Sequence, residues 1–398
     1  MSNETIAVVA GHLCLDVIPD MSRSSREQFE RMFQPGRLLD VGPVTFSTGG
    51  AVSNTGLALN KLGIKTALMG KIGEDIFGQA IRQIVASYGA DLTGALIIDP
   101  NATTSYTVII NPPGIDRIFL HCPSANDTFT AGDVRYDLLD APSVRLFHFG
   151  YPPLMKRMYE GEGAELADIF RQVKSRNLTT SLDMALPDVN SPAGRANWPA
   201  IIRAVMPYVD VFLPSIEEIL FMFRRATYDE LSSQAGGASR ILPLVTPELL
   251  SDLSGELIDL GVKIVGLKLG DRGLYVRTAG QSAIERMGRA RPANLAAWAN
   301  REMWAPCFQV EVVGAAGSGD STISGFLGGL LRDLSPEQTV TAAVAVGACN
   351  VEKADTLSGV RSWDETQQRI ARGWPRHALT LKSPRWRNDP VQGLWLRG

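Results

Sequence analysis

A loop of small residues in the last third of the chain carries the residue types best suited to chemistry on an anion. The loop reads Gly317-Ser318-Gly319-Asp320. Its glycines and serine let an anion approach the backbone N–H groups closely, and the positive end of a helix dipole would add to the attraction. The pattern therefore predicts a cradle for a phosphate or another oxyanion. The alternative is a tight turn in which Asp320 only caps the following helix.

The segments on either side of this loop are predicted to be a strand and a helix. Residues 308–313 alternate in polarity and are rich in β-branched side chains, which is typical of a strand. After Asp320, apolar residues recur at the i, i+3, i+4, i+7 and i+8 positions of a helix that packs on a sheet. These residues are Ile323, Phe326, Leu327, Leu330 and Leu331.

Composition excludes several classes of protein. The chain has 398 residues, 45% of them hydrophobic and 20% charged, so it can bury a large core as one domain or two. A net charge of −3 gives no basic field for nucleic acid or an anionic membrane. Neither a signal peptide nor a run of roughly 18 apolar residues is found, so we expect no membrane span. Widely spaced cysteines predict a reducing cytoplasm, without disulfides or structural zinc.

Short apolar runs alternate with amphipathic segments over most of the length. The expected strands are residues 6–10, 66–69, 144–149, 179–183, 209–213 and 263–267. The expected helices are residues 54–62, 78–88, 164–176, 216–223 and 246–260, with a further helix opened by Ser335. Such alternation predicts an α/β fold with a mainly parallel sheet covered on both faces, and ligands at the carboxyl ends of its strands.

Two stretches interrupt this alternation. Residues 12–48 hold a charged segment at 22–37 and then a strand-like run to Phe46. Residues 101–123 hold two expected strands, 105–110 and 117–121, joined by turn-forming residues. Together these stretches predict a small β-sheet lid over the strand ends. The tail, residues 374–398, has no clear period and is expected to be irregular.

Five motifs in order resemble those of the ribokinase-like, phosphofructokinase-B (PfkB) family of sugar and nucleoside kinases. They span roughly residues 5–370 of this chain and are Gly49-Gly50-Ala51-Val52-Ser53-Asn54, then GKIGEDIFG at 70–78, PSIEE at 214–218, KLGDRG at 268–273 and GSGD at 317–320. The resemblance implies a ribokinase-like three-layer sandwich with a mainly parallel central sheet and a small β-sheet lid. It assigns residues 1–373 to the kinase domain and leaves 374–398 as a tail.

The resemblance also implies roles in phosphoryl transfer. Such a reaction requires a positioned hydroxyl, compensation of negative charge and a proton acceptor. By resemblance, Asp320 is the base on the substrate hydroxyl. The amides of Gly317, Ser318 and Gly319 would face the charge that develops on the γ-phosphoryl group of ATP.

Residues nearer the amino end would bind the acceptor. The resemblance implies that Asp16 accepts hydrogen bonds from sugar hydroxyls, with a turn aspartate as the alternative. Gly49 and Gly50 would let the backbone approach the substrate, and Asn54 can donate and accept toward a diol. Arg117 would reach in from the lid, or else be a solvated strand arginine. The histidines are interpreted as structural: His12, His121 and His148.

The nucleotide and its metal ion would lie on the other side of the loop. The resemblance implies that Glu218 holds the water shell of Mg²⁺, since magnesium prefers few carboxylates and several waters; a surface glutamate is the alternative. Thr341 and Ala345 are expected to line the adenine pocket, although small helix residues often serve packing alone. The remaining expected nucleotide contacts are Ser215, Lys268, Gly270 and Gly273.

The chain also departs from the family pattern. Gly314-Ala315 stands where the family usually has Asp-Thr, and in members activated by potassium that aspartate helps to bind the ion, so such activation is not expected here. Ser215 replaces the usual asparagine, and Lys268 replaces a common threonine, which predicts altered nucleotide contacts.

The resemblance leads to an ATP-dependent kinase acting on a sugar or sugar-like hydroxyl, with ATP and Mg²⁺ as cofactors. A nucleoside or phosphosugar kinase and a catalytically idle regulatory member are the alternatives. A dinucleotide oxidoreductase is disfavoured because no G-x-G-x-x-G follows the first expected strand. Because an open β-lid has unpaired edges and an exposed apolar face, we also predict a homodimer formed through the lid.

Overall fold

A computed structural model describes residues 4–23, 29, 34–36, 38–112 and 118–398. Within this part of the chain, one large sheet contains β1 (Ala7–Gly11), β4 (Thr66–Met69), β9 (Leu146–Gly150), β10 (Thr179–Leu182), β11 (Val211–Phe212), β12 (Ile264–Lys268), β13 (Leu274–Thr278), β14 (Glu302–Ala305), β15 (Trp386–Asp389) and β16 (Leu394–Arg397). The strand order is β15-β16-β14-β13-β12-β11-β10-β9-β1-β4. Strands β4 through β12 in this order are parallel, and the strands beyond β12 are antiparallel.

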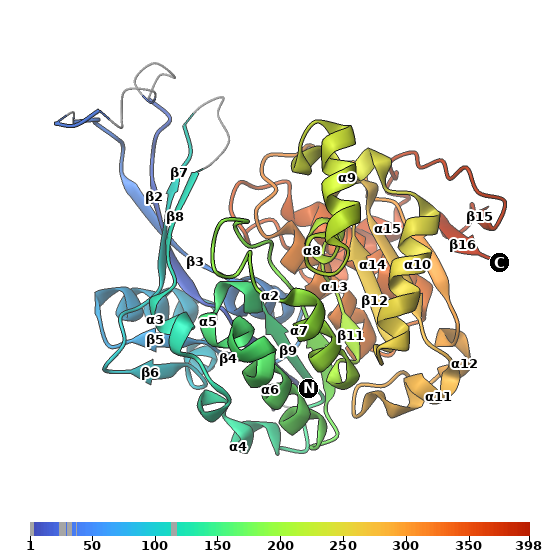
Figure 1. The fold of residues 1–398 in the computed structure, drawn as a ribbon, viewed down its shortest axis with the longest axis horizontal. Coiled ribbons are helices and arrows are strands. Elements are labelled where there is room, and N and C mark those ends of the chain that lie inside the picture. The colour runs from blue at the N-terminus through green and yellow to red at the C-terminus, as the bar shows by residue number, and fades with distance from the viewer. Residues whose placement is uncertain (1–3, 24–28, 30–33, 37, 113–117) are drawn as a thin grey trace.

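Helices cover both faces of this sheet, as the alternation predicted. On one face, the hydrophobic core contains Val8 of β1 and residues of α6 (Ala164–Lys174), α7 (Trp198–Val205), α8 (Ile216–Phe223) and α10 (Pro247–Asp259). On the other, Ala7 and Val9 pack with α2 (Ala51–Lys61), α3 (Ile76–Tyr88), α13 (Ser318–Leu331) and α14 (Pro336–Asn350). Successive residues of β1 thus point to opposite faces, and both faces are dry, which explains why its sequence is continuously apolar. The three-layer arrangement is visible in Figure 1.

Shorter elements complete the described part of the chain. They include β5 (Lys71–Gly73) and β6 (Ile97–Asp99), which form a separate parallel pair. The other helices are α4 (Tyr136–Leu139), α5 (Lys156–Tyr159), α9 (Arg225–Ala235), α11 (Gln281–Ile284), α12 (Leu295–Trp298) and α15 (Trp363–Ala371). In the part of the chain that the structure describes, no helix is both long and apolar enough to cross a membrane.

Side-chain caps fix the starts of several predicted helices. Thr246 accepts a hydrogen bond from Leu249 N at the start of α10, and Ser335 forms a reciprocal capping box with Gln338 at the start of α14. Such caps satisfy backbone N–H groups that have no partner within the helix. The residues that signalled these helix starts in the sequence therefore act as predicted.

A second sheet forms the predicted lid. It contains β2 (Cys14–Pro19), β3 (Val44–Gly49), β7 (Tyr106–Ile110) and β8 (Ile118–Cys122), in the order β3-β2-β7-β8. Figure 1 shows these strands projecting from the edge of the main body. The two strands expected at 105–110 and 117–121 are β7 and β8. Most of the charged segment at 22–37 lies outside the described residues.

The strand expected at 308–313 does not form. The chain leaves the sheet at the end of β14, and of this segment only Phe308 makes a bridge, an isolated one to Arg376. Pro306, which follows β14 directly, lacks the N–H that a ladder needs. Val312 and Val313 are exposed, and Val313 N bonds to Val351 O instead of a neighbouring strand. The alternating pattern here belongs to an extended surface segment.

The tail beyond residue 374, expected to be irregular, contains strands β15 and β16, which extend the large sheet. Trp386 and Leu394 are buried. Arg397 Nη1 donates to Glu302 Oε2 of β14 at 2.6 Å, and Tyr275 OH donates to Glu302 Oε1 at 2.8 Å. This buried carboxylate joins the end of the chain to the sheet through contacts that no local pattern reveals.

Replacing this carboxylate should loosen the tail. We expect Glu302→Ala to lower the free energy of unfolding by about 2–4 kcal/mol, because it leaves a buried tyrosine hydroxyl and an arginine without their acceptor. Urea unfolding at equilibrium measures the change. The control is Arg387→Ala on exposed β15 sequence, which should stay within about 0.5 kcal/mol of the wild type. Equal effects of the two substitutions would contradict the assigned role of Glu302.

Candidate active site

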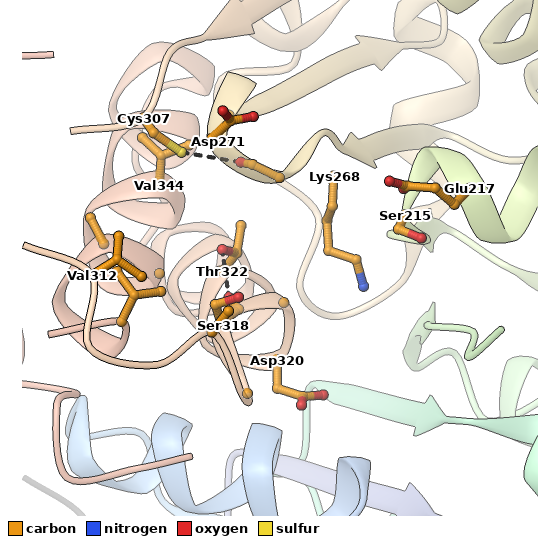
Figure 2. A pocket seen from close by; sticks show the side chains of 18 of the residues that line it. Ser215, Glu217, Lys268, Asp271, Cys307, Val312, Ser318, Asp320, Thr322 and Val344 are labelled. Carbon is orange, nitrogen blue, oxygen red and sulfur yellow. Dashed lines mark hydrogen bonds between the residues drawn. The ribbon is translucent and has the colours of Figure 1, made fainter. Parts of the chain in front are cut away.

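Four neighbouring parallel strands end at one cavity of about 570 Å³. Tyr151 follows β9, Asp183 follows β10, Ser215 lies shortly after β11, and Lys268 is the last residue of β12. The start of α13 closes the opposite side of the cavity, and Figure 2 shows Lys268 and Asp320 extending into the same space. The carboxyl edge of a parallel sheet is where α/β folds bind ligands.

Asp320 is held at this edge by three hydrogen-bond donors. Its side chain is 2% exposed and lies in the first turn of α13. Oδ2 accepts from Tyr151 OH at 2.8 Å and from Asn54 Nδ2 at 3.1 Å, and Oδ1 accepts from Thr55 Oγ1 at 3.2 Å. The carboxylate is therefore fixed in orientation by residues of two other elements, which a simple helix cap would not require.

The surroundings of Asp320 act on its pKa in opposite directions. Burial raises the pKa of Asp320, whereas Lys268 and the three hydrogen bonds lower it, and the net direction is upward. Burial also holds the pKa of Tyr151 well above its usual range, so its phenol stays protonated and donates. The helix dipole further favours the anionic form of a carboxylate in the first turn. A carboxylate with a raised pKa is a better proton acceptor than an ordinary aspartate.

The glycine loop reaches α13 through a left-handed residue. Gly317 has φ +70°, and a Cβ there would lie 2.9 Å from Thr356 Cβ, so glycine is required for both reasons. The first N–H groups of a helix have no partner within it, which leaves this end open to an anion. One difference from the expectation is that Ser318 N donates to Ala315 O at 3.3 Å within the loop. Gly317, Ser318 and Gly319 all line the cavity.

Two further carboxylates and one ammonium group lie at the strand ends. Lys268 Nζ is 2.6 Å from Asp183 Oδ1. The other oxygen, Asp183 Oδ2, is buried and has no hydrogen-bond partner among the described residues. Glu218 is partly buried, and its Oε2 accepts from Ser215 N at 2.6 Å in a capping box. Burial raises the pKa of Glu218, and Lys268 opposes that shift.

These oxygens fit a magnesium ion that keeps most of its water. Among the described residues, no group of three or more His, Cys, Asp and Glu side chains is placed to bind a metal. Magnesium in nucleotide sites commonly uses one or two carboxylates together with water and phosphate oxygens. The unpartnered oxygen of Asp183 and the carboxylate of Glu218 supply this kind of donor set.

The expected acceptor residues lie together outside the lining of the 570 Å³ cavity, and among them Asn54 contacts Asp320. Asp16 lies on lid strand β2, and burial raises its pKa to about 6. Gly50, at φ +90°, would place a Cβ 2.4 Å from His12 O and needs glycine, whereas a Cβ on Gly49 would lie 2.5 Å from Asp16 Oδ2 and would displace that carboxylate. Asn54, on the helix that follows, donates to Asp320. Arg117 lies outside the described residues.

The expected nucleotide residues divide into two groups. Ser215, Gly270 and Gly273 line the cavity. Thr341 does not: its hydroxyl accepts from Arg376 Nη2 at 3.0 Å and faces a different depression. Ala345 is completely buried and is not a lining residue either. The face of α14 that lines the cavity consists of Val344, Gly347 and Ala348, with Val351 just beyond the helix. The sequence predicted helix α14, but its many small residues did not indicate which face of the helix lines the cavity.

Sequence reasoning missed three residues of the site. Tyr151 and Thr55 hold Asp320, and Asp183 holds Lys268. The available signal was position, since Tyr151 and Asp183 stand just after expected strands, where a parallel sheet presents side chains to a ligand. Tyr151 also has φ +64°, an unusual conformation for a non-glycine residue that local sequence does not predict.

The histidines interpreted as structural lie outside the lining of the cavity. Burial lowers the pKa of His12 to about 3, so its ring is neutral, and its Nε2 lies 3.4 Å from His121 Nε2. His148 Nδ1 is 3.0 Å from Ser181 Oγ, within the sheet, and burial lowers its pKa in the same way. None of the three is a lining residue of the cavity.

The fold of this chain is shared by solved structures. Solved structures with this fold include ribokinase from Arabidopsis thaliana complexed with ribose and ATP, with a TM-score of 0.67 and 16% identity, covering 92% of this chain and 98% of that one. A putative ribokinase II from E. coli in complex with ATP and Mg²⁺ has a TM-score of 0.62 and 18% identity, with 93% and 99% covered. The ribokinase-like fold expected from the motifs is therefore confirmed.

The family follows from the sequence comparison. Residues 6–363 match the model of the pfkB family of carbohydrate kinases, and the chain belongs to this family. It is 26% identical to probable fructokinase-5 of Arabidopsis thaliana over 228 residues, which cover 56% of this chain and 64% of that protein. It is 27% identical to fructokinase-2 of Oryza sativa subsp. japonica over 233 residues, covering 56% and 62%. The chain thus matches less than two thirds of the length of these relatives.

Proposed function

We propose that the protein is an ATP-dependent kinase that transfers the γ-phosphoryl group of ATP to a hydroxyl of a sugar or sugar-like small molecule. The observation that carries this proposal is the buried Asp320, held by three donors beside a glycine loop at one end of a nucleotide-sized cavity. Family membership and the names of the relatives, fructokinase and ribokinase, support a sugar as the acceptor. Four free cysteines are consistent with the cytoplasm as the site of action.

Each step of the reaction has a residue in this proposal. Asp320 accepts the proton of the acceptor hydroxyl, whose oxygen forms a bond to the γ-phosphorus. The bond from that phosphorus to the bridging oxygen breaks, and its electron pair leaves with ADP. Tyr151 and Asn54 keep the carboxylate oriented, and the amides of the glycine loop stabilise charge on the moving group.

The cavity would bind the nucleotide, and the acceptor residues grouped around Asn54 would bind the sugar. Asp16, Gly49 and Gly50 would contact the sugar, and the strand ends with the apolar face of α14 would contact the nucleotide. Glu218 and Asp183 would hold Mg²⁺ through its water shell, and the ion would neutralise phosphate charge.

Removing the proposed base gives the most direct test. We expect Asp320→Asn to lower kcat by roughly 100-fold or more, because an amide cannot accept the hydroxyl proton. Release of ADP with a panel of sugars and nucleosides measures turnover, and thermal unfolding checks the fold. Asp259→Asn, an exposed change on α10, is the matched control and should be neutral. Turnover near that of the wild type in a folded Asp320→Asn protein would rule out Asp320 as the base.

The same experiment has a pH arm. Because the base must be deprotonated, kcat/KM should fall as pH drops through the pKa of Asp320. Since that pKa is raised, the acid limb should lie above the ordinary aspartate range of about 4. An acid limb that persists unchanged in Asp320→Asn belongs to another group.

Glu218→Gln should raise the concentration of Mg²⁺ needed for half-maximal turnover. The neutral amide is a poorer anchor for metal-bound water, yet its oxygen can still accept from Ser215 N and preserve the capping box. A magnesium titration at saturating ATP measures the shift. Glu230→Gln, at an exposed position of α9 outside the cavity, is the control. Coincident titrations of both variants and wild type would mean that Glu218 only caps its helix.

The lid is proposed to pair with a second copy. The strand register places Val17, Phe46, Val108 and Leu120 on one face of the lid, and Phe46 and Leu120 are about half exposed. Light scattering at micromolar concentration should give twice the chain mass of 43.1 kDa. Phe46→Glu should shift the mass toward the monomer, whereas Val391→Glu, at a fully exposed tail position, should not. A monomeric wild type is the contrary result.

A further inference from the structure

Lys268 stands out because its charge is buried against the site and the proton-transfer step does not use it. Its side chain is 13% exposed, and it ends β12 at the carboxyl edge of the sheet. Its backbone is fixed by a hydrogen bond from Lys268 N to Pro214 O, at 3.0 Å, and by a bridge to Ser215. A lysine stem has high rotational entropy, so a defined strand end and close walls are needed to keep Nζ in one place.

The ammonium group lies between carboxylates and the anion loop. Nζ is 2.6 Å from Asp183 Oδ1, and a Cβ built on Gly319 would be only 3.6 Å from Nζ. Gly319 thus presents its backbone to the ammonium group with no side chain between them. Figure 2 shows the lysine extending toward Asp320 from the strand side. An anion bound at the loop would therefore meet Nζ directly.

The charges around Lys268 keep it protonated. Burial lowers its pKa, but Asp183, Glu218 and Asp320 outweigh burial and the net shift is upward. One ammonium group faces three carboxylates, so its charge does not by itself balance theirs. A nucleoside triphosphate adds more negative charge, and its terminal phosphoryl group needs a positive partner.

We propose that Lys268 binds the terminal phosphoryl group of the nucleotide and is a catalytic residue of the transfer. In the free protein Asp183 holds the ammonium group, and on nucleotide binding Nζ donates to an oxygen of the γ-phosphoryl group while Asp183 keeps it in place. A fixed point charge of this kind stabilises negative charge on the moving group. The inference rests on the proposed function for its catalytic part, whereas the contact itself needs only nucleotide binding.

ADP, which lacks the terminal phosphoryl group, isolates this contact. Calorimetric titration with ATP and with ADP, without acceptor and both with Mg²⁺ and with EDTA, gives the ratio of their dissociation constants. We expect Lys268→Met to weaken ATP binding by about tenfold or more and ADP binding by less than about threefold, since a charge-assisted contact is lost only with ATP. Lys268→Arg should restore much of the ATP preference because it keeps the charge.

A second buried lysine provides a matched control. Lys263 precedes β12 at its other end, is 9% exposed and pairs with the buried Asp210 at 3.4 Å. Lys263→Met should lower stability without changing the ratio of ATP to ADP affinity. Lys268→Met leaves the buried carboxylate of Asp183 unpaired and could prevent folding. In that case the Asp183→Asn variant is compared with the double variant Lys268→Met/Asp183→Asn, because neither has a carboxylate at position 183.

The outcomes separate this inference from the proposed function. Equal losses of ATP and ADP affinity in folded Lys268→Met, or no loss of either, would overturn the contact. A wild type that binds ATP with the predicted lysine dependence but phosphorylates no sugar or nucleoside would overturn the proposed function and leave the contact standing. A wild type that binds neither nucleotide would overturn both.

Discussion

The structure depends on how negative charge is held at the carboxyl edge of the parallel sheet. Asp183, Glu218 and Asp320 converge on one cavity, where loss of water alone would make ionised carboxylates costly. Lys268, the dipole of α13 and the donors to Asp320 compensate for this cost. The same interactions orient the Asp320 carboxylate as a proton acceptor and place the Lys268 ammonium group beside the glycine loop. The electrostatic constraint and the proposed chemistry therefore involve the same atoms.

The parallel sheet and two glycines bring the residues of the site close to one another. Parallel strands β9 to β12 end together, so residues distant in sequence meet without long side chains. Gly50 and Gly317 take left-handed backbone conformations where a Cβ would strike the backbone or a side chain. Gly50 lies directly between lid strand β3 and helix α2, which carries Asn54 and Thr55. The lid is thus covalently adjacent to the residues that hold Asp320.

The sequence predicted the parallel core well because its strands are buried on both faces and its helices carry recognisable caps such as Thr246 and Ser335. Elements that depend on long-range contacts were not predictable. The alternating residues 308–313 imitate a strand, but Pro306 ends the ladder before them. Strands β15 and β16 form because Arg397 binds Glu302 and because Trp386 and Leu394 are buried against the rest of the sheet. A short segment without a hydrophobic repeat does not reveal from its sequence that it will pair with a distant strand.

The site was predictable where motifs fix it and not where three-dimensional geometry does. Asp320 and Glu218 were found by their motifs, and both line the cavity. Tyr151 was missed because its role follows from a left-handed turn after β9. Thr341 lies outside the lining of the cavity, and its position could not be predicted because a helix rich in small residues gives no indication of which face meets a ligand.

The central claim is that this arrangement moves a phosphoryl group from ATP to a carbon-bound hydroxyl. Phosphorus NMR of the wild-type protein with ATP, Mg²⁺ and each of a set of free sugars follows the γ-phosphorus directly. The account predicts that, with at least one sugar, the γ resonance is replaced one for one by a phosphomonoester resonance as ADP appears. If ATP binds but its γ-phosphorus stays in place, or appears only as inorganic phosphate with every sugar and nucleoside tested, the account is contradicted.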